Sequence, residues 1–178
     1  MPSPKSIEEV NQMQYEQFMH YLGNIVEEAP WVTSSIWSCR PFNDAKELHH
    51  TVCTLLDEVP LIVKESVLRG HPDLAGKLAQ QNQLTPESTR EQAAAGLPDL
   101  TPEKGKLISE FNQKYKAKFD FPFVICAREN KVESIMKGLQ IRVENCRETE
   151  AMTGISEIKK ICGYRIADLL STDTDSKM

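Results

Sequence analysis

A threonine followed by a proline occurs twice in this chain, at Thr85-Pro86 and at Thr101-Pro102. Threonine is a favoured N-cap residue and proline fits the first helical position, so each pair predicts the start of a helix. Ser88 and Glu91, just inside the first of these helices, also have the spacing of a capping box. Start signals of this kind, followed by apolar residues at helical spacing, recur along most of the sequence and predict an all-α fold.

Helical periodicity covers nearly the whole chain. Ser6 and Glu9 have capping-box spacing, and either Asn43 or Asp44 is placed to cap a later helix. The ranges predicted to be helical are 6–30, 31–37, 43–60, 60–68, 101–119, 132–147 and 153–170, with two short helices flanking a turn at residue 71. Pro122 argues against a central strand in the one run with extended character. We therefore predict a single-domain multi-helix bundle over residues 1–178, with one short extended segment near Phe121–Ala127 and disordered ends near 1–5 and 171–178.

Composition argues against several kinds of partner. The 178 residues are 40% hydrophobic and 26% charged, as in a soluble globular protein, and the apolar runs are far shorter than the ~20 residues of a membrane span. The net charge is −5 and lysine and arginine form no block, so no nucleic-acid partner is predicted. Five cysteines without a Cys-x-x-Cys pair indicate neither a disulfide framework nor a zinc ribbon, and we expect them to be reduced.

Residues 70–97 concentrate the groups that could carry chemistry. Gly70 ends one apolar-periodic run and Pro72 disfavours a helical conformation at His71, so we expect a turn to present the imidazole, which need not be buried. A positioned histidine is a common general acid or base near neutral pH. Glu91 is the acid placed to pair with it, and the helix start beside it offers hydrogen-bond donors suited to a carboxylate or an imide oxygen.

Four sequence blocks carry a resemblance to a known family. In order, they are His71-Pro72-Asp73-Leu74; Ser88-x-x-Glu91-Gln92 leading into Ala95-Gly96-Leu97; Lys118-Phe119-Asp120-Phe121-Pro122-Phe123-Val124-Ile125-Cys126; and Glu157-Ile158 with Arg165-Ile166. From about Phe42 to about Leu170 the chain resembles the OHCU decarboxylase family. Its members convert 2-oxo-4-hydroxy-4-carboxy-5-ureidoimidazoline (OHCU) into (S)-allantoin during urate degradation. Asp120 departs from the pattern, because many relatives have glycine there.

The resemblance implies a cofactor-independent carboxy-lyase. Loss of CO₂ leaves an electron pair on a ring carbon, and the adjacent C=N unit of the substrate can accept it, so neither a cofactor nor a metal is expected. By resemblance, His71 is the catalytic acid or base, Glu91 orients its imidazole and favours the protonated form, and Arg165 donates to a carboxylate or ureido oxygen. The residues expected to bind the substrate are Pro72, Ser88, Thr89, Arg90, Glu91, Gln92, Phe123, Val124, Ile125, Cys126 and Ala127.

The last three residues, Ser176-Lys177-Met178, are close to the Ser-Lys-Leu form of a peroxisomal address. Urate oxidation in many eukaryotes is peroxisomal, so the tail and the resemblance agree on a peroxisomal location and on an import receptor as a partner. The other partners implied are the substrate OHCU and the product (S)-allantoin. The resemblance also implies a homodimer, and no membrane partner is predicted.

Two other functions remain open. The first is a catalytically inactive all-α binding module of the same fold, in which His71 would be a turn residue, Glu91 a capping acid and Arg165 a solvated arginine near a helix end. The second is a metal-dependent amidohydrolase that uses His71, Asp73 and another histidine, although the residue spacing is poor for a metal site. Formation of allantoin would exclude the first, and sensitivity to chelators would favour the second.

Overall fold

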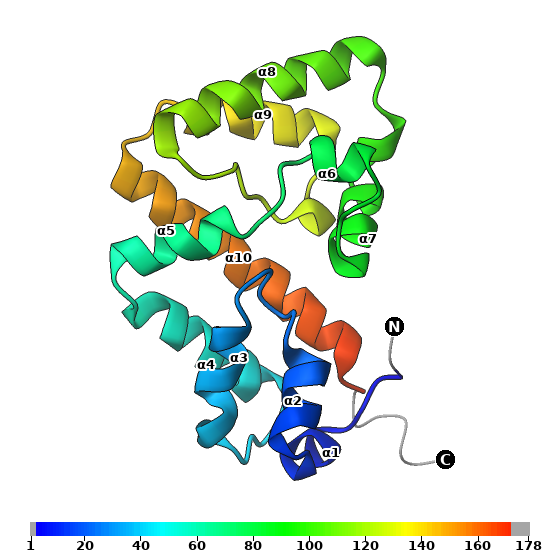
Figure 1. The fold of residues 1–178 in the computed structure, drawn as a ribbon, viewed down its shortest axis with the longest axis vertical. Coiled ribbons are helices and arrows are strands. Elements are labelled where there is room, and N and C mark those ends of the chain that lie inside the picture. Colours follow the sequence, from blue (N-terminus) through cyan, green and yellow to red (C-terminus); the bar gives the residue numbers. More distant parts are fainter. Residues whose placement is uncertain (1–2, 172–178) are drawn as a thin grey trace. The chain divides into compact units, whose positions relative to one another are not determined.

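The computed structural model describes residues 3–171, which are largely helical (Figure 1). The helices are α1 (Ile7–Gln12), α2 (Tyr15–Leu22), α3 (Pro30–Ile36), η1 (Trp37–Cys39), α4 (Ala45–Glu58), α5 (Leu61–Arg69), α6 (Lys77–Gln80), α7 (Pro86–Ala94), η2 (Leu97–Asp99), α8 (Pro102–Phe119), η3 (Ala127–Glu129), α9 (Val132–Arg142) and α10 (Arg147–Leu169). Lys5 and Leu170 form an isolated bridge, and residues 3–171 contain no named strand. The predicted all-α fold is confirmed.

Two compact units share the described residues. The terminal unit contains residues 3–59 and 159–171, and the central unit contains residues 60–158. Helix α10 contributes residues to both units. Each unit buries its own set of apolar side chains. That the two units together make one domain, as the sequence suggests, stays a prediction.

The terminal unit is built from helices that bury one apolar face each. Helix α2 contacts α3, and α3 contacts α4. Asp44, one of two candidates, caps α4 by accepting a hydrogen bond from the Glu47 N–H (2.8 Å). Apolar residues then recur every fourth position along α4, as expected for a buried helical face. The residues of the unit that are 0% exposed are Val10, Phe18, Leu22, Val32, Thr33, Leu48, Val52, Leu56 and Cys162.

The continuous helical range predicted over 6–30 is wrong, because the chain forms two separate helices there. Helix α1 ends at Gln12, and α2 begins at Tyr15 and ends at Leu22. Arg40 Nη1 donates to the carbonyl oxygens of Asn11 (2.8 Å) and Met13 (3.0 Å). Carbonyls at a helix end lack intrahelical donors, so this distant arginine satisfies them and stabilises the break.

Both ends of the described chain are hydrogen-bonded. The Lys5 N–H donates to Leu169 O (3.0 Å), and the Ser171 N–H donates to Lys5 O (2.9 Å). Tyr21 Oη donates to Ser3 O (3.0 Å). The predicted disorder is therefore corrected at Ser3, Lys5 and Ser171, whose backbones are bonded. The remainder of that prediction, at 1–2 and 172–178, lies outside the described residues.

A cluster of aromatic side chains forms the core of the central unit. Tyr115 and Phe119 of α8 meet Phe121 and Phe123, and neighbouring ring centroids lie between 4.7 and 6.2 Å apart. All four side chains are 1% exposed, and aromatic pairs at such distances stabilise a fold beyond their buried area. Helix α8 also contacts α9, beside which it runs (Figure 1). The extended segment near Phe121–Ala127 is thus a buried part of the core, as predicted.

The prediction for the last two helices is wrong at their junction. Helix α9 ends at Arg142 instead of residue 147, and α10 begins at Arg147 instead of residue 153. Lys118 Nζ donates to Val143 O (2.6 Å), and Asn145 Nδ2 donates to Glu150 Oε2 (2.8 Å). These bonds stabilise a non-helical turn over 143–146.

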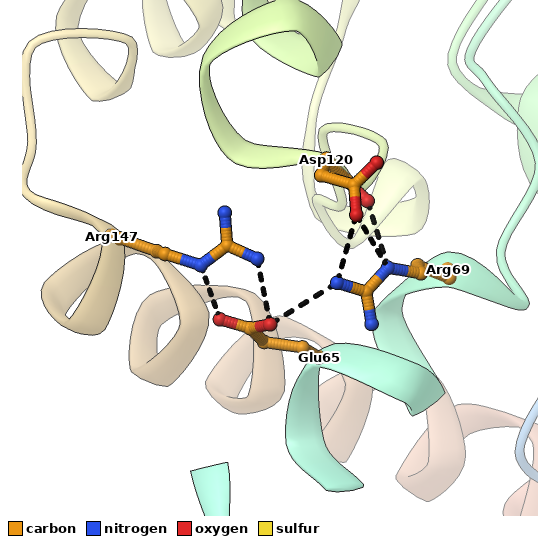
Figure 2. A network of polar contacts seen from close by, with 4 residues as sticks. All are labelled: Glu65, Arg69, Asp120 and Arg147. Atoms are coloured by element: carbon orange, nitrogen blue, oxygen red, sulfur yellow. Dashed lines mark hydrogen bonds and ion pairs between the residues drawn. The ribbon is translucent and has the colours of Figure 1, made fainter. Parts of the chain in front are cut away.

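Glu65 on α5 lies at the centre of a network of charged side chains. Figure 2 shows the guanidinium groups of Arg147 and Arg69 approaching its carboxylate from two sides. Arg147 donates to Glu65 at 2.6 and 2.7 Å, and Arg69 donates at 3.1 Å. Glu65 is only 4% exposed. Hydrogen bonds from Arg147, with the charges of both arginines, lower the pKa of Glu65 more than its burial raises it.

Asp120 ends α8 in a left-handed conformation. Its φ is 62°, and its N–H donates to Lys116 O (2.8 Å). Glycine adopts this conformation readily, and aspartate is one of the few other residues that tolerate it. The Asp120 carboxylate and backbone oxygen accept from Arg69 at 3.1 and 2.9 Å (Figure 2). The departure from the family pattern therefore keeps the turn and adds a partner for Arg69.

We expect Glu65→Gln to lower the thermal unfolding midpoint at pH 7 and to have a smaller effect in acid. Folding lowers the pKa of Glu65, so its ionised form stabilises the fold above the ordinary value of 4.5, and this contribution is lost as the pH falls through the lowered value. Thermal unfolding of both proteins at several pH values measures the difference. Glu148→Gln, which changes an exposed carboxylate of α10, is the control. A Glu65→Gln effect that is independent of pH would contradict this role.

Candidate functional site

His71 lies in the turn directly after α5. Gly70 is the C-cap of that helix, and the His71 N–H donates to Leu68 O (3.1 Å). The side chain of His71 is 8% exposed, so the structure buries it although a turn position did not require burial. His71 lines a pocket of about 710 Å³, within the range of small-molecule sites. The pocket wall also includes Arg69, Pro72, Asp73, Asn112 and Lys116.

Side chains from α7 and α8 hold the turn that follows His71. Gln92 Oε1 accepts from the Ala75 N–H (2.9 Å), and Asn112 Nδ2 donates to Leu74 O (2.9 Å). Lys116 Nζ lies 3.1 Å from Asp73 Oδ2. Ala75 has a φ of 50°, which is uncommon for a residue with a side chain. These bonds therefore stabilise a sharply turned backbone beside the pocket, and they engage the amide oxygen of the predicted binding residue Gln92.

Helix α7 begins where the sequence predicts. Thr85 is the N-cap and its hydroxyl accepts from the Ser88 N–H (3.3 Å), with Pro86 at the first helical position. The predicted capping box of Ser88 and Glu91 is wrong, because Ser88 is already inside the helix and its N–H is bonded to Thr85. Ser88, Glu91 and Gln92 are buried at 4, 8 and 5% exposure. These three predicted site residues therefore lie on the buried face of α7, within the central unit.

The other two predicted binding residues of α7 have more exposed side chains. Thr89 Oγ1 donates to Thr85 O (2.9 Å), and Arg90 Nη2 lies 3.5 Å from Glu87 Oε1. The Arg90 side chain is 38% exposed. Helix α7 contacts η3, which begins at Ala127. The fold therefore brings α7 to the end of the extended segment, the two regions in which most of the binding residues are predicted.

Side chains clamp the backbone of the predicted binding segment 123–127. Arg142 Nη1 donates to Val124 O (2.8 Å). The Cys126 N–H donates to Glu157 Oε2 (2.8 Å), and Asn130 Nδ2 donates to Cys126 O (2.9 Å). A substrate contact at Cys126 stays a prediction, and its amide and carbonyl already take part in these bonds. The clamp fixes the direction in which the neighbouring peptide groups point.

The clamp rests on a buried carboxylate, that of Glu150. Arg142 donates to Glu150 Oε1 through Nε (2.9 Å) and Nη2 (2.6 Å), and Tyr115 Oη donates to the same oxygen. Burial, together with the Glu150 carboxylate, raises the pKa of Tyr115. The thiol of Cys126 is 1% exposed and its pKa is raised by burial. Cys126 therefore behaves as a small core residue, and the chain's five cysteines are free as expected.

Comparison with known proteins places this geometry in a family. A family model described as OHCU decarboxylase matches residues 11–167. The chain belongs to the OHCU decarboxylase family. A protein described as 2-oxo-4-hydroxy-4-carboxy-5-ureidoimidazoline decarboxylase from Xenopus laevis is 46% identical over 160 residues, which are 90% of this chain and 91% of the relative. The predicted resemblance is confirmed, and membership in this family makes the chain a decarboxylase of the urate degradation pathway.

Two solved structures support the fold. A structure of (S)-allantoin synthase has a TM-score of 0.76 at 18% sequence identity. The match covers 95% of this chain and 55% of that longer chain. A structure of OHCU decarboxylase in the presence of (S)-allantoin has a TM-score of 0.69 at 21% identity. This second match covers 84% of this chain and 97% of the OHCU decarboxylase chain. The all-α architecture is thus that of known OHCU decarboxylase structures.

The three predicted catalytic residues are divided between the two units of this OHCU decarboxylase family member. His71 and Glu91 belong to the central unit, and Arg165 belongs to the terminal unit, on α10. Arg165 is 3% exposed, so the alternative of a solvated arginine near a helix end is wrong. Its Nη1 lies 2.7 Å from Glu27 Oε2 and donates to Asn24 O (2.9 Å). The catalytic roles of all three residues stay predictions.

The sequence did not indicate the residues that hold the site in shape. Gln92 and Glu157 lie within the family blocks, but nothing in those blocks showed that they bond the backbone of Ala75 and Cys126. Arg142 lies outside the blocks and has no local signal. Among residues 3–171, no group of three or more His, Cys, Asp and Glu could hold a metal ion. Within the same residues, no helix is long and apolar enough to cross a membrane.

We expect Glu157→Ala to raise the KM for OHCU more than it lowers kcat. The change removes the acceptor for the Cys126 N–H, so the predicted binding segment loses one of its fixed points while the chemical groups stay in place. Glu157→Gln retains an acceptor oxygen and should stay close to the unchanged protein. Steady-state kinetics on OHCU generated from urate measures both parameters, with Ser156→Ala on the exposed side of α10 as the control. A wild-type KM in folded Glu157→Ala would show that the bond between Glu157 and Cys126 does not shape the binding segment.

Proposed function

We propose that this chain catalyses the cofactor-independent, stereospecific decarboxylation of OHCU to (S)-allantoin and CO₂, with His71 as the acid or base. The observation that carries the proposal is the family match over residues 11–167, which includes a His71 that is buried beside a pocket. The Xenopus laevis relative is named as a decarboxylase of this compound, and one solved neighbour was obtained in the presence of (S)-allantoin.

The protein has two tasks in this reaction, which are to place the substrate and to deliver a proton. The bond between the ring carbon and the carboxylate breaks, and its electron pair moves into the adjacent C=N unit of the substrate. A double bond forms between the two ring carbons, and the nitrogen of the former C=N unit takes up a proton. The hydroxyl on the carbon that lost CO₂ then gives up its proton and becomes a carbonyl, while the neighbouring carbon, which bears the ureido group, takes up a proton to give allantoin. We assign this proton to His71, because an imidazole titrates near neutral pH and can donate or accept as the reaction requires. Delivery to one face of the ring sets the S configuration.

Glu91 and Arg165 are assigned supporting catalytic roles. A carboxylate that approaches an imidazole orients the ring and favours its protonated form, and Glu91 is a buried acid on the helix that also holds the His71 turn through Gln92. A guanidinium offers planar donors that match a carboxylate or a ureido oxygen. Arg165 is the buried arginine of the fourth family block and is assigned to substrate binding and charge stabilisation.

Substrate binding is assigned to Pro72, to Ser88, Thr89, Arg90, Glu91 and Gln92 of α7, and to Phe123, Val124, Ile125, Cys126 and Ala127. Backbone amides and carbonyls suit a heterocycle that is rich in N–H and C=O groups. The clamp on the extended segment supports this assignment, because it fixes a stretch of non-helical backbone next to α7. The ring of Phe123, 1% exposed, is assigned to exclude water from one face of the substrate.

We also propose that the protein is peroxisomal and homodimeric. The support for the location is Ser176-Lys177-Met178, which lies outside the described residues, together with the urate pathway. The import receptor for that tripeptide is the implied partner, and the dimer is implied by the family. Fusion of the last residues to a fluorescent protein tests the address, and light scattering of the purified protein tests the oligomeric state.

We expect His71→Gln to lower the rate of allantoin formation by about 100-fold or more, the usual share of general acid–base catalysis. Glutamine is close in size to histidine, so the buried turn should remain folded. Circular dichroism follows the allantoin formed when urate is oxidised and hydrolysed enzymatically in the presence of the protein, with and without a chelator. His50→Gln, which changes an exposed histidine of α4, is the control.

Three outcomes would contradict the proposed function. Full activity of folded His71→Gln would show that the catalytic assignment is wrong. Racemic allantoin at the rate seen without protein would identify the chain as an inactive binding module. Loss of activity with the chelator would favour a metal-dependent enzyme.

A further inference from the structure

Arg165 is paired with a carboxylate that is as deeply buried as itself. Arg165 Nη1 lies 2.7 Å from Glu27 Oε2, and each side chain is 3% exposed. The same nitrogen donates to Asn24 O (2.9 Å). Removing two charges from water costs free energy that is recovered only when the geometry is good and further hydrogen bonds form. The pair therefore constrains the orientation of the Arg165 guanidinium.

The loop that carries Glu27 has a defined shape. Glu28 has a φ of 51°, a left-handed conformation that is uncommon for such a residue, so the chain turns sharply just after Glu27. Thr33 Oγ1 of α3 donates to Leu22 O at the end of α2 (2.9 Å) and ties together the two helices that the loop connects. The apolar residues of the loop are buried, namely Ile25, Val26 and Ala29. Glu27 is thus presented from an anchored loop.

We propose that Glu27 is a positioning residue for the decarboxylation, which acts by holding the guanidinium of Arg165 in the orientation that meets a substrate oxygen. The inference rests on the proposed role of Arg165. Because the guanidinium is planar and its donors point in fixed directions, an anchor on one nitrogen sets the direction of the others. A flexible arginine would have to lose its rotamer freedom each time the substrate binds, and the Glu27 pair removes that cost beforehand.

A purely structural ion pair would have a different signature from a positioning residue. Loss of a structural pair lowers the unfolding midpoint and leaves the kinetics of the folded protein unchanged. Loss of a positioning residue changes the kinetics of protein that is still folded. The two are separated by measuring kcat/KM well below the unfolding midpoint and by asking whether Glu27 is needed for a guanidinium supplied from solution.

The first test uses Glu27→Asp, which keeps the charge and withdraws the carboxylate by one methylene group, and Glu27→Gln, which removes the charge. We expect both to lower kcat/KM by about 10- to 100-fold, since a misplacement of about 1 Å can cost 100-fold. Thermal unfolding identifies the temperature at which each variant is folded. Glu16→Gln, which changes an exposed carboxylate on α2, should leave kcat/KM unchanged.

The second test uses chemical rescue. Arg165→Ala should be inactive, and added guanidinium chloride at concentrations that do not unfold the protein should restore part of the activity by occupying the place of the side chain. In Arg165→Ala with Glu27→Gln, rescue should disappear or require about tenfold more guanidinium, because its buried counterion is missing. In Arg165→Ala with Glu16→Gln, rescue should be unchanged. A residue that only stabilised the fold would not alter the guanidinium concentration needed.

The possible results distinguish the role of Glu27 from that of Arg165. Wild-type kcat/KM in folded Glu27→Asp and Glu27→Gln, with an inactive Arg165→Ala, would overturn the positioning role and leave the proposed function intact. Equal rescue with and without Glu27 would overturn it as well. Wild-type activity in Arg165→Ala would instead overturn the proposed role of Arg165 itself. If guanidinium rescues no variant, the first test stands alone. A lowered kcat/KM in folded Glu27→Asp then supports the positioning role, and a wild-type kcat/KM overturns it.

Discussion

The fully buried carboxylate of Glu150 is the interaction on which the central unit depends. It accepts hydrogen bonds from Arg142 at the end of α9, from Asn145 in the turn before α10, and from Tyr115 in the aromatic cluster. Arg142, oriented by Glu150, uses its remaining nitrogen to hold Val124. A buried charge that loses a partner strongly destabilises a fold. Helix ends, aromatic core and extended segment are therefore linked through one side chain.

Where the sequence predicts a helix correctly, the signal is local. Asp44, Thr85 and Thr101 each accept a hydrogen bond from a backbone N–H three residues later, so the sequence around each cap contains all that is needed to recognise it. The ends of helices were predicted less well. Helix α1 ends where Arg40 binds its last carbonyls, and the turn after α9 receives Lys118 from α8. These donors are distant in sequence from the helix ends that they bond, so no local pattern indicates where the helices end.

The candidate site likewise has parts that the sequence predicted and parts that it did not. The turn at His71 followed from its neighbours, and the roles assigned to His71 and Arg165 followed from blocks that resemble a family. The bond from Glu157 to the extended segment and the pairing of Glu27 with Arg165 could not be predicted, because each partner is distant in sequence. On its own, each of these glutamates resembles an ordinary surface acid. Only the fold shows that one of them bonds a buried peptide group and the other is buried against an arginine.

The left-handed residue at the end of α8 also limits how this sequence can change. Asp120 adopts a backbone conformation that glycine adopts with less strain, and its carboxylate gives Arg69 a second acidic partner besides Glu65. Glycine at position 120 would relax the backbone and leave Arg69 to share Glu65 with Arg147. A neutral residue at position 69 would instead leave the strained aspartate without its bond. The two positions are therefore coupled during sequence divergence, and the order in which they are replaced determines how stable the intermediate protein is.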